Sequence, residues 1–322
     1  MDIIKQIKSP AELTVETSAS GVRLDIFIST KLPTYSRSYF QKLIKSGNVL
    51  LNGEVNKIPK TIVCSGVKIS INWPAEQNYE IPQGEVFSYT ILFEDNDIIV
   101  LDKPAGVVVH PAAGNWEGTI VNALIGRDNS FINKFSDEAD MTSLQRPGIV
   151  HRLDKDTSGC LVIAKNILSR QRLSASFASR DIKKTYSALS CGVSKEHSGN
   201  ITTLIGRHPV NRKKMAVVQK NGKEAITSYR IEKSGQIDGV SVSLLEVNIL
   251  TGRTHQIRVH LAHIKLPVLG DKVYGGHQRL IVPRQMLHAR EIVFPHPKTG
   301  DTVSVISPYP EDFQYYLNQI LF

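Results

Sequence analysis

A short polar stretch lies between two apolar runs and combines the side chains that acid–base and nucleophilic chemistry require. Its members are His151, Arg152, Asp154, Lys155, Asp156, Thr157 and Ser158. The flanking runs, residues 148–150 and 160–164, predict two buried strands. A polar loop held between buried strands suits a catalytic or binding site. The alternative is a solvated turn with local ion pairs, since the sequence Asp-Thr-Ser-Gly is typical of turns.

Two later segments contain further candidate groups. Residues 183–186 read Lys-Lys-Thr-Tyr, and residues 251–260 read Thr-Gly-Arg-Thr-His-Gln-Ile-Arg-Val-His. The second segment begins like a helix after a glycine turn, with Ile257 and Leu261 on one face and Arg258 on another. An arginine on the site-facing side of that helix can pair with a carboxylate far away in the sequence.

The histidines of the second half do not predict a metal site. His255 and His260 are five residues apart, which places them on different faces of a helix, and no cysteine lies near them or near His263. The three cysteines of the chain are far apart and show no zinc spacing. We therefore expect neither a bound metal nor a disulfide framework.

Length, composition and charge narrow the class of protein. The chain has 322 residues, of which 41% are hydrophobic, so it can bury the cores of two domains. It lacks an apolar run long enough to span a bilayer, and its start lacks the apolar core of a signal peptide, so we expect a cytoplasmic protein without membrane contacts. The net charge of +9 favours a polyanionic partner, because Lys and Arg that neutralise phosphates release counterions. A basic soluble protein without such a partner is the alternative.

Residues 15–73 predict a small N-terminal domain. Apolar residues at helical spacing over 24–28 and 40–44 predict two helices, and Asn52-Gly53 predicts a hairpin turn. Residues 67–71 alternate like a half-buried strand. Residues 1–20 show no clear period and predict a loose arm.

Residues 74–88 have linker composition, with proline, glycine and glutamate but no periodicity, and residues 89–322 predict the larger domain. Strands are predicted at 89–93, 98–101, 185–190, 227–232 and 242–250, and helices at 118–124 and 167–179. Strands outnumber helices and do not alternate strictly with them. This favours an α+β fold with a mixed, mainly antiparallel sheet flanked by helices and loops.

The N-terminal domain resembles the alpha-L RNA-binding module of ribosomal proteins and RNA-modifying enzymes. The resemblance rests on Arg-Leu-Asp at 23–25, Ser-Arg-Ser at 36–38 and the Asn-Gly hairpin. It implies that Arg23, Arg37 and Lys42 grip structured RNA through its shape and phosphates. A small helical appendage for protein contacts is the alternative.

The whole chain resembles the RluA family of ribosomal RNA pseudouridine synthases. Three segments match in order: His-Arg-Leu-Asp-x-x-Thr-Ser-Gly from 151, Lys-x-Tyr from 184, and Gly-Arg-x-His-Gln-x-Arg-Val-His from 252. The sequences Val-Leu-Asp-Lys-Pro-Ala-Gly from 100 and His288-Ala289 add agreement. The resemblance implies a pseudouridine synthase fold in the branch that carries the N-terminal RNA module.

This resemblance implies roles for the three segments. Asp154 is the catalytic carboxylate, which acts either as a nucleophile on the sugar or as a base, and its neighbour Asp156 is interpreted as a turn residue. Arg258 is the salt-bridge partner of Asp154. Tyr186 stacks on the target base and assists proton removal at its carbon, with an aromatic core residue of a strand as the alternative. Arg152 fills the gap left by the flipped uridine, with an ion pair to a neighbouring carboxylate as the alternative. We expect His151 and Arg253 to contact RNA as well.

The implied function is isomerisation of specific uridines to pseudouridine in RNA, with large-subunit ribosomal RNA or a pre-ribosomal particle as the partner. This reaction is redox-neutral, so no cofactor is implied, and we expect a monomer. The alternative is a non-catalytic RNA-binding factor for ribosome assembly that retains the fold.

Overall fold

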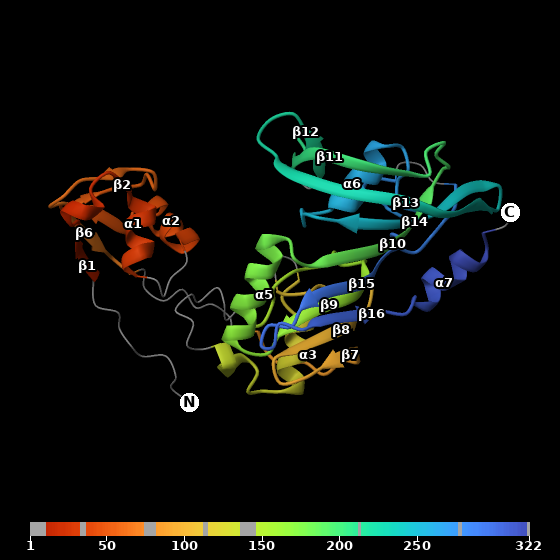
Figure 1. The fold of residues 1–322 in the computed structure, drawn as a ribbon, viewed down its shortest axis with the longest axis horizontal. Coiled ribbons are helices and arrows are strands. Elements are labelled where there is room, and N and C mark those ends of the chain that lie inside the picture. The colour runs from red at the N-terminus through yellow and green to blue at the C-terminus, as the bar shows by residue number, and fades with distance from the viewer. Residues whose placement is uncertain are drawn as a thin grey trace. The chain divides into compact units, whose positions relative to one another are not determined.

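The computed structural model describes residues 11–32, 37–73, 82–111, 115–135, 146–211, 214–275 and 279–320. The chain divides into two compact units (Figure 1). The N-terminal unit comprises Met1–Ile81 together with Phe135–Gln145, and the larger unit comprises Pro82–Lys134 together with Arg146–Phe322.

The described part of the N-terminal unit contains two helices packed on short strands. Its elements are β1 (Ala11–Thr14), η1 (Thr17–Ala19), β2 (Val22–Arg23), α1 (Leu24–Lys31), α2 (Arg37–Lys45), β3 (Val49–Leu51), β4 (Glu54–Val55), β5 (Ile62–Val63) and β6 (Lys68–Ile71). Both predicted helices form, and their apolar residues from 24–28 and 40–44 are buried in one core. The predicted hairpin also forms, because Asn52 and Gly53 both adopt positive φ angles, of 49° and 88°.

The prediction of a loose arm over residues 1–20 was wrong for its second half. β1 pairs antiparallel with β6 and completes a sheet in the order β1-β6-β3-β4. Residues 11–14 alternate between half-buried and exposed side chains, but four residues are too few for that period to stand out in the sequence. Residues 1–10 lie outside the described residues.

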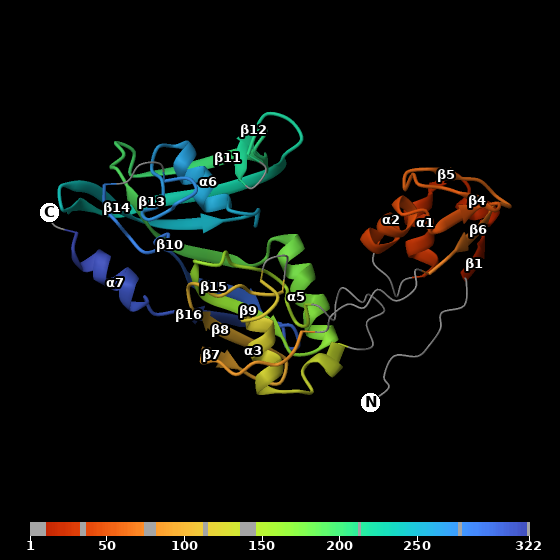
Figure 2. The ribbon, with the colours of Figure 1, turned by 180° about the vertical axis from the view of Figure 1, so that it is seen from behind.

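The larger unit is built around one extended sheet (Figures 1 and 2). Its strands are β7 (Thr90–Glu94), β8 (Ile98–Lys103), β9 (Ser158–Ala164), β10 (Lys183–Cys191), β11 (Ser198–Arg207), β12 (Met215–Val218), β13 (Lys223–Ile237), β14 (Val240–Ile249), β15 (Leu287–Pro295) and β16 (Thr302–Ile306). Its helices are α3 (Ile120–Arg127), η2 (Ile132–Phe135), α5 (Ile167–Ser179), α6 (Gln256–His263) and α7 (Glu311–Asn318).

The strand order confirms the predicted α+β class. The sheet runs β12-β11-β13-β14-β10-β15-β9-β8-β7, and β16 pairs with β15. β9 and β15 pair in parallel, and the other pairs in the described sheet are antiparallel. The parallel pair matters for the site, because it places Ser158, which follows the polar loop, beside His288 of β15.

The helices are held by separate parts of the core. Leu173 of α5 packs with the buried residues of β8 and β9, Val259 of α6 packs with those of β11 and β13, and Phe313 of α7 packs with those of β10 and β14. Within the described residues, no helix has both the length and the apolar character needed to cross a bilayer.

The second half of the predicted linker packs on the larger unit. Asn122 of α3 donates through its side chain to the Gln83 carbonyl at 2.8 Å, and its own carbonyl accepts from the Glu85 amide at 2.9 Å. Residues 74–81 lie outside the described residues. The larger unit therefore begins at Pro82, ahead of the predicted position 89.

The strand predicted before the polar loop does not form. Residues 148–150 make one isolated bridge, between Ile149 and Ile163, instead of a ladder. Gly148 turns the chain with a φ of 71°, and a Cβ at this position would lie 2.3 Å from the Ala164 carbonyl oxygen. The His151 ring then accepts the Val162 amide at 2.8 Å, so a side chain satisfies the backbone group that a second strand would have paired.

Candidate active site

The polar loop, residues 151–157, is held by a hydrogen bond within its own backbone and by a side chain of β8. The Thr157 amide donates to the Asp154 carbonyl at 3.1 Å and closes a turn immediately before β9. Lys103, at the end of β8, is fully buried, and its ammonium donates to the Lys155 carbonyl at 3.0 Å. The same ammonium donates to the carbonyls of Pro104 and Val107. Lys103 therefore joins the loop to the segment that follows β8.

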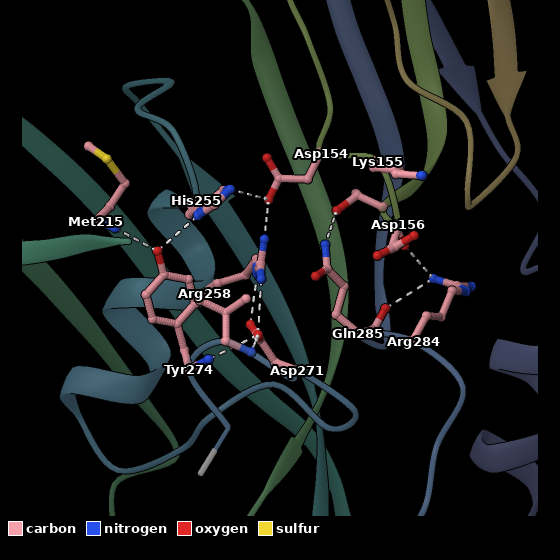
Figure 3. A network of polar contacts seen from close by, with 12 residues as sticks. Asp154, Lys155, Asp156, Met215, His255, Arg258, Asp271, Tyr274, Arg284 and Gln285 are labelled. Carbon is pink, nitrogen blue, oxygen red and sulfur yellow. Dashed lines mark hydrogen bonds and ion pairs between the residues drawn. The ribbon is translucent and has the colours of Figure 1, made fainter. Parts of the chain in front are cut away.

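Asp154 is the terminal carboxylate of a buried ionic chain (Figure 3). Arg258 of α6 donates through Nη1 to Asp154 Oδ2 at 2.9 Å, so the ion pair expected from the sequence is present. On its other edge, Arg258 donates through Nε and Nη2 to the two oxygens of Asp271, at 2.7 and 3.0 Å. The Asp271 side chain is fully buried, whereas 18% of the Asp154 side chain is exposed.

The charges and hydrogen bonds of this ionic network keep Arg258 and Asp271 ionised. Burial favours the neutral form of Arg258, but the hydrogen bonds and charges of Asp271 and Asp154 outweigh it and raise the arginine pKa above its ordinary value. Burial likewise raises the pKa of Asp271, but Arg258 and the amides of Val273 and Tyr274 reverse the effect, so the pKa is lowered overall. Asp154 therefore contacts a permanently charged Arg258, which Asp271 holds in place on its other edge.

Asp271 was missed in the sequence analysis. It follows Gly270, which has a φ of 76°, in a segment whose sequence is typical of an ordinary turn. The burial of Arg258 could have indicated a second acidic partner. A buried guanidinium has five N–H donors and needs more acceptors than one carboxylate oxygen provides.

A histidine and a tyrosine lie beside the ionic chain. His255 has its Nε2 3.9 Å from Asp154 Oδ2 and its Nδ1 2.8 Å from the Tyr274 hydroxyl. That hydroxyl accepts the Met215 amide at 2.9 Å, which leaves its own proton for His255 Nδ1. Burial lowers the pKa of His255, although the charge of Asp154 opposes the shift. A neutral His255 thus presents Nε2–H toward Asp154.

Asp154, His255 and Arg258 line a cavity of about 470 Å³ that brings all three predicted segments together. Asp154 from the loop, Tyr186 from β10 and Arg258 from α6 all contribute to its wall. Tyr186 is 7% exposed, and burial, reinforced by the charge of Asp154, raises the pKa of its hydroxyl. Tyr186 therefore offers a protonated phenol and a ring surface next to the carboxylate.

Two of the predicted RNA contacts, Arg152 and Arg253, lie on the wall of the same cavity. Arg152 is exposed, and Arg253 donates through Nε to the Glu224 carbonyl at 2.8 Å. His151 contributes to the wall too, but its ring is bonded to Val162 and stacks on Phe177, with 4.8 Å between the centroids. Burial lowers the pKa of His151 to about 3, so its ring is neutral at pH 7, and the expected RNA contact of this residue stays a prediction.

Two of the three predicted RNA contacts of the N-terminal unit pair with a buried carboxylate. Arg23 and Arg37 pair with Asp25 Oδ2 at 2.9 and 3.0 Å, and Asp25 is fully buried. The two arginines are nevertheless 31% and 46% exposed, so part of each guanidinium faces solvent. Lys42 is exposed on α2.

A different triad, outside the cavity, has the spacing of metal ligands. Ligand atoms of Asp95, Asp97 and His296 all lie within 4.8 Å of one another. These atoms are already engaged, however, because His296 pairs with Asp95 at 2.8 Å and Asp97 accepts from Asn166 at 3.0 Å. The other Asp95 oxygen accepts the Asp97 and Ile98 amides. The triad thus holds the β7–β8 turn against the loop after β15.

Comparison with known proteins decides the class of enzyme. Residues 97–263 match the RNA pseudouridylate synthase family, and residues 22–69 match the S4 domain. The chain belongs to the RNA pseudouridylate synthase family. It is an RNA pseudouridine synthase, which isomerises uridine to pseudouridine, and the resemblance inferred from the sequence is confirmed.

Relatives of similar length share both units. A protein of Xanthomonas campestris named ribosomal large subunit pseudouridine synthase D is 37% identical, over 96% of this chain and 92% of its own. A protein of the same name from Pseudomonas aeruginosa is 40% identical, over 97% and 95%. Among solved structures, human RNA pseudouridylate synthase domain containing 1 has a TM-score of 0.56 and 28% identity, covering 70% of this chain and 86% of that one. The fold prediction is therefore confirmed as well.

Proposed function

We propose that this synthase modifies uridines of large-subunit ribosomal RNA, with Asp154 as the reacting carboxylate. The observation that carries the proposal is the position of Asp154: its side chain is partly exposed to the cavity, while Arg258 fixes one of its oxygens. The names of the relatives with ribosomal large-subunit activity support the choice of RNA.

The reaction exchanges one bond of the anomeric carbon for another. The bond from C1′ of ribose to N1 of uracil breaks, uracil turns, and a bond from C1′ to C5 forms. The C5 proton is lost and N1 gains one, so atoms and electrons balance without a redox partner. Asp154 assists the first step either by attacking C1′ or by removing a proton from the sugar, and both routes begin from the carboxylate that Arg258 orients.

Tyr186 suits a stacking role on the flipped uracil. Its ring lies in the cavity wall, and base–aromatic stacking contributes about 1–3 kcal/mol. Its raised pKa keeps the hydroxyl protonated at neutral pH, which favours stacking and hydrogen bonding over a role as the resting base. We assign Arg258 to orienting Asp154, since it binds that carboxylate and Asp271 together.

The cations divide into two groups by location. Arg152 and Arg253 line the cavity, and we assign them to contacts with the target nucleotide and its neighbours. Arg23, Arg37 and Lys42 belong to the S4 domain, and we assign them to phosphate contacts with structured RNA. Phosphate contacts of this kind strengthen binding and weaken with added salt.

Mapping of pseudouridine in ribosomal RNA tests the proposal. Large-subunit RNA is compared by chemical modification and sequencing between cells with and without this protein. We expect a small set of sites to disappear on deletion, to return with the wild-type gene, and to stay absent with Asp154→Asn. Unchanged large-subunit RNA, with sites lost elsewhere, would overturn the choice of substrate. Full complementation of growth by Asp154→Asn would instead indicate an essential role as an assembly factor.

A further inference from the structure

The polar loop is also held from the side opposite to Arg258, by a segment that precedes β15. Arg284 and Gln285 lie there, and both are less than a tenth exposed. Figure 3 shows Arg258 and Arg284 approaching the loop from two sides. Arg284 donates through Nη1 to the Asp156 carbonyl at 3.0 Å, and Gln285 donates through Nε2 to Thr157 Oγ1 at 3.0 Å.

Arg284 is itself anchored by the last helix of the chain. Its Nε and Nη2 donate to the two oxygens of Asp312, in the first turn of α7, at 2.5 and 2.8 Å. The helix is firmly seated, because the neighbouring Phe313 is fully buried and stacks on Tyr309 with 4.9 Å between ring centroids. The guanidinium thus donates to a carboxylate of α7 on one edge and to a backbone carbonyl of the polar loop on the other.

The backbone of Arg284 meets the second arm of the site as well. A Cβ placed on Gly270 would lie 2.0 Å from the Arg284 carbonyl oxygen, so glycine is required at this close approach. Gly270 immediately precedes Asp271, the carboxylate that holds Arg258. Arg284 therefore contacts both the polar loop, which carries Asp154, and the segment that carries Asp271.

We propose that Arg284 and Asp312 are positioning residues, which set the distance between Asp154 and Arg258 and make the C-terminal helix part of the catalytic machinery. Arg284 does not line the cavity, so it acts through the loop and not on the substrate. The inference rests on the proposed role of Asp154.

Lysine is a poor substitute for arginine here, because one ammonium cannot span a carboxylate and a carbonyl as a planar guanidinium does. In Arg284→Lys we expect kcat to fall on the order of 100-fold, the scale of a 1 Å misplacement, with KM for RNA nearly unchanged. Asp312→Asn keeps one acceptor oxygen and is expected to lower kcat by about 10-fold, also without a change in KM. Because both variants weaken the same link, their effects should not add in the double variant.

Arg290→Lys is the matched control. Arg290 lies on β15, six positions further along, and donates to the Ser307 carbonyl while its guanidinium lies 4.5 Å from the Tyr309 ring centroid. Its substitution should leave kcat within about twofold of wild type. Unfolding curves of all variants, together with KM, separate misplacement of the loop from general loss of structure.

The outcomes distinguish this inference from the proposed function. Wild-type kcat in Arg284→Lys, with Asp154→Asn inactive, would overturn the positioning role alone. Activity in Asp154→Asn would overturn the catalytic assignment itself. An equal loss in kcat for Arg284→Lys and Arg290→Lys would also contradict the inference, because it would reflect damage to β15.

Discussion

Arg258 binds two carboxylates that differ in burial and in hydrogen bonding, and replacing each by its amide should separate their roles. Asp271 is fully buried and accepts two hydrogen bonds from Arg258 and two from backbone amides. Asp154 is 18% exposed and accepts one hydrogen bond from Arg258. We expect Asp271→Asn to cost mainly stability and Asp154→Asn to cost mainly activity.

The magnitudes follow from these contacts. An amide at 271 keeps one acceptor oxygen and turns an NH₂ group toward a donor, so the buried guanidinium loses a charge-compensating partner. Breaking a buried pair in this way costs about 3–5 kcal/mol of unfolding free energy. At position 154 a single partly solvated interaction is lost, for which about 1 kcal/mol or less is expected.

Urea denaturation of the full chain, followed by circular dichroism, measures both costs under one set of conditions. Turnover on an RNA substrate is measured in parallel, and we expect residual activity in Asp271→Asn but none in Asp154→Asn. Equal destabilisation by the two substitutions would contradict this prediction, because it would mean that the two carboxylates share one structural role. A cost below about 1 kcal/mol for Asp271→Asn would refute it too.

Three further predictions concern acid stability, the tyrosine and RNA affinity. Burial alone would raise the pKa of Asp25, but hydrogen bonds from Arg23, Gln41 and Arg37 lower it to about 2. The stabilisation from Asp25 is therefore present above about pH 4 and is lost as the pH falls toward 2; Asp25→Asn should lack this component of the acid-unfolding profile. Since burial raises the pKa of Tyr186, the pH profile of kcat should show no tyrosine ionisation up to about pH 10, and an inflection that disappears in Tyr186→Phe would contradict this. Lys42→Gln should weaken RNA binding and reduce the salt slope of log Kd by about one, whereas an unchanged slope would exclude a phosphate contact.

Much of the site was accessible from sequence because it lies in local patterns. Apolar spacing predicted α5 within its observed bounds and also the helix that carries Arg258. The helical pattern of each segment is contained in its own sequence, so it can be recognised without the rest of the fold. Resemblance to a known family then linked Asp154, Tyr186 and Arg258, which the folded domain places around one cavity.

What the sequence did not reveal are contacts that only the fold creates. Asp271, Tyr274, Arg284 and Asp312 lie in turns or at a helix start, where local sequence is typical of ordinary loops. The strand predicted at 148–150 failed for a related reason, because a side chain, His151, satisfies the amide that a strand would have paired. Periodicity predicts elements but does not identify hydrogen-bond partners, whether they lie 13 residues apart, as Arg258 and Asp271 do, or 128, as Arg284 and Asp156 do.

On the proposed function, Asp154 is the group that begins the reaction in this cavity. Release of the C5 hydrogen from RNA labelled at C5 of uridine tests it most directly, with RNA binding measured on the same samples. Asp156→Asn is the matched control, since Asp156 lies two positions further along the same loop and meets Arg284 through its backbone carbonyl. We expect Asp154→Asn to bind RNA as the wild type does but to release no hydrogen, while Asp156→Asn retains turnover. Hydrogen release by Asp154→Asn at the wild-type rate would mean that another group begins the reaction.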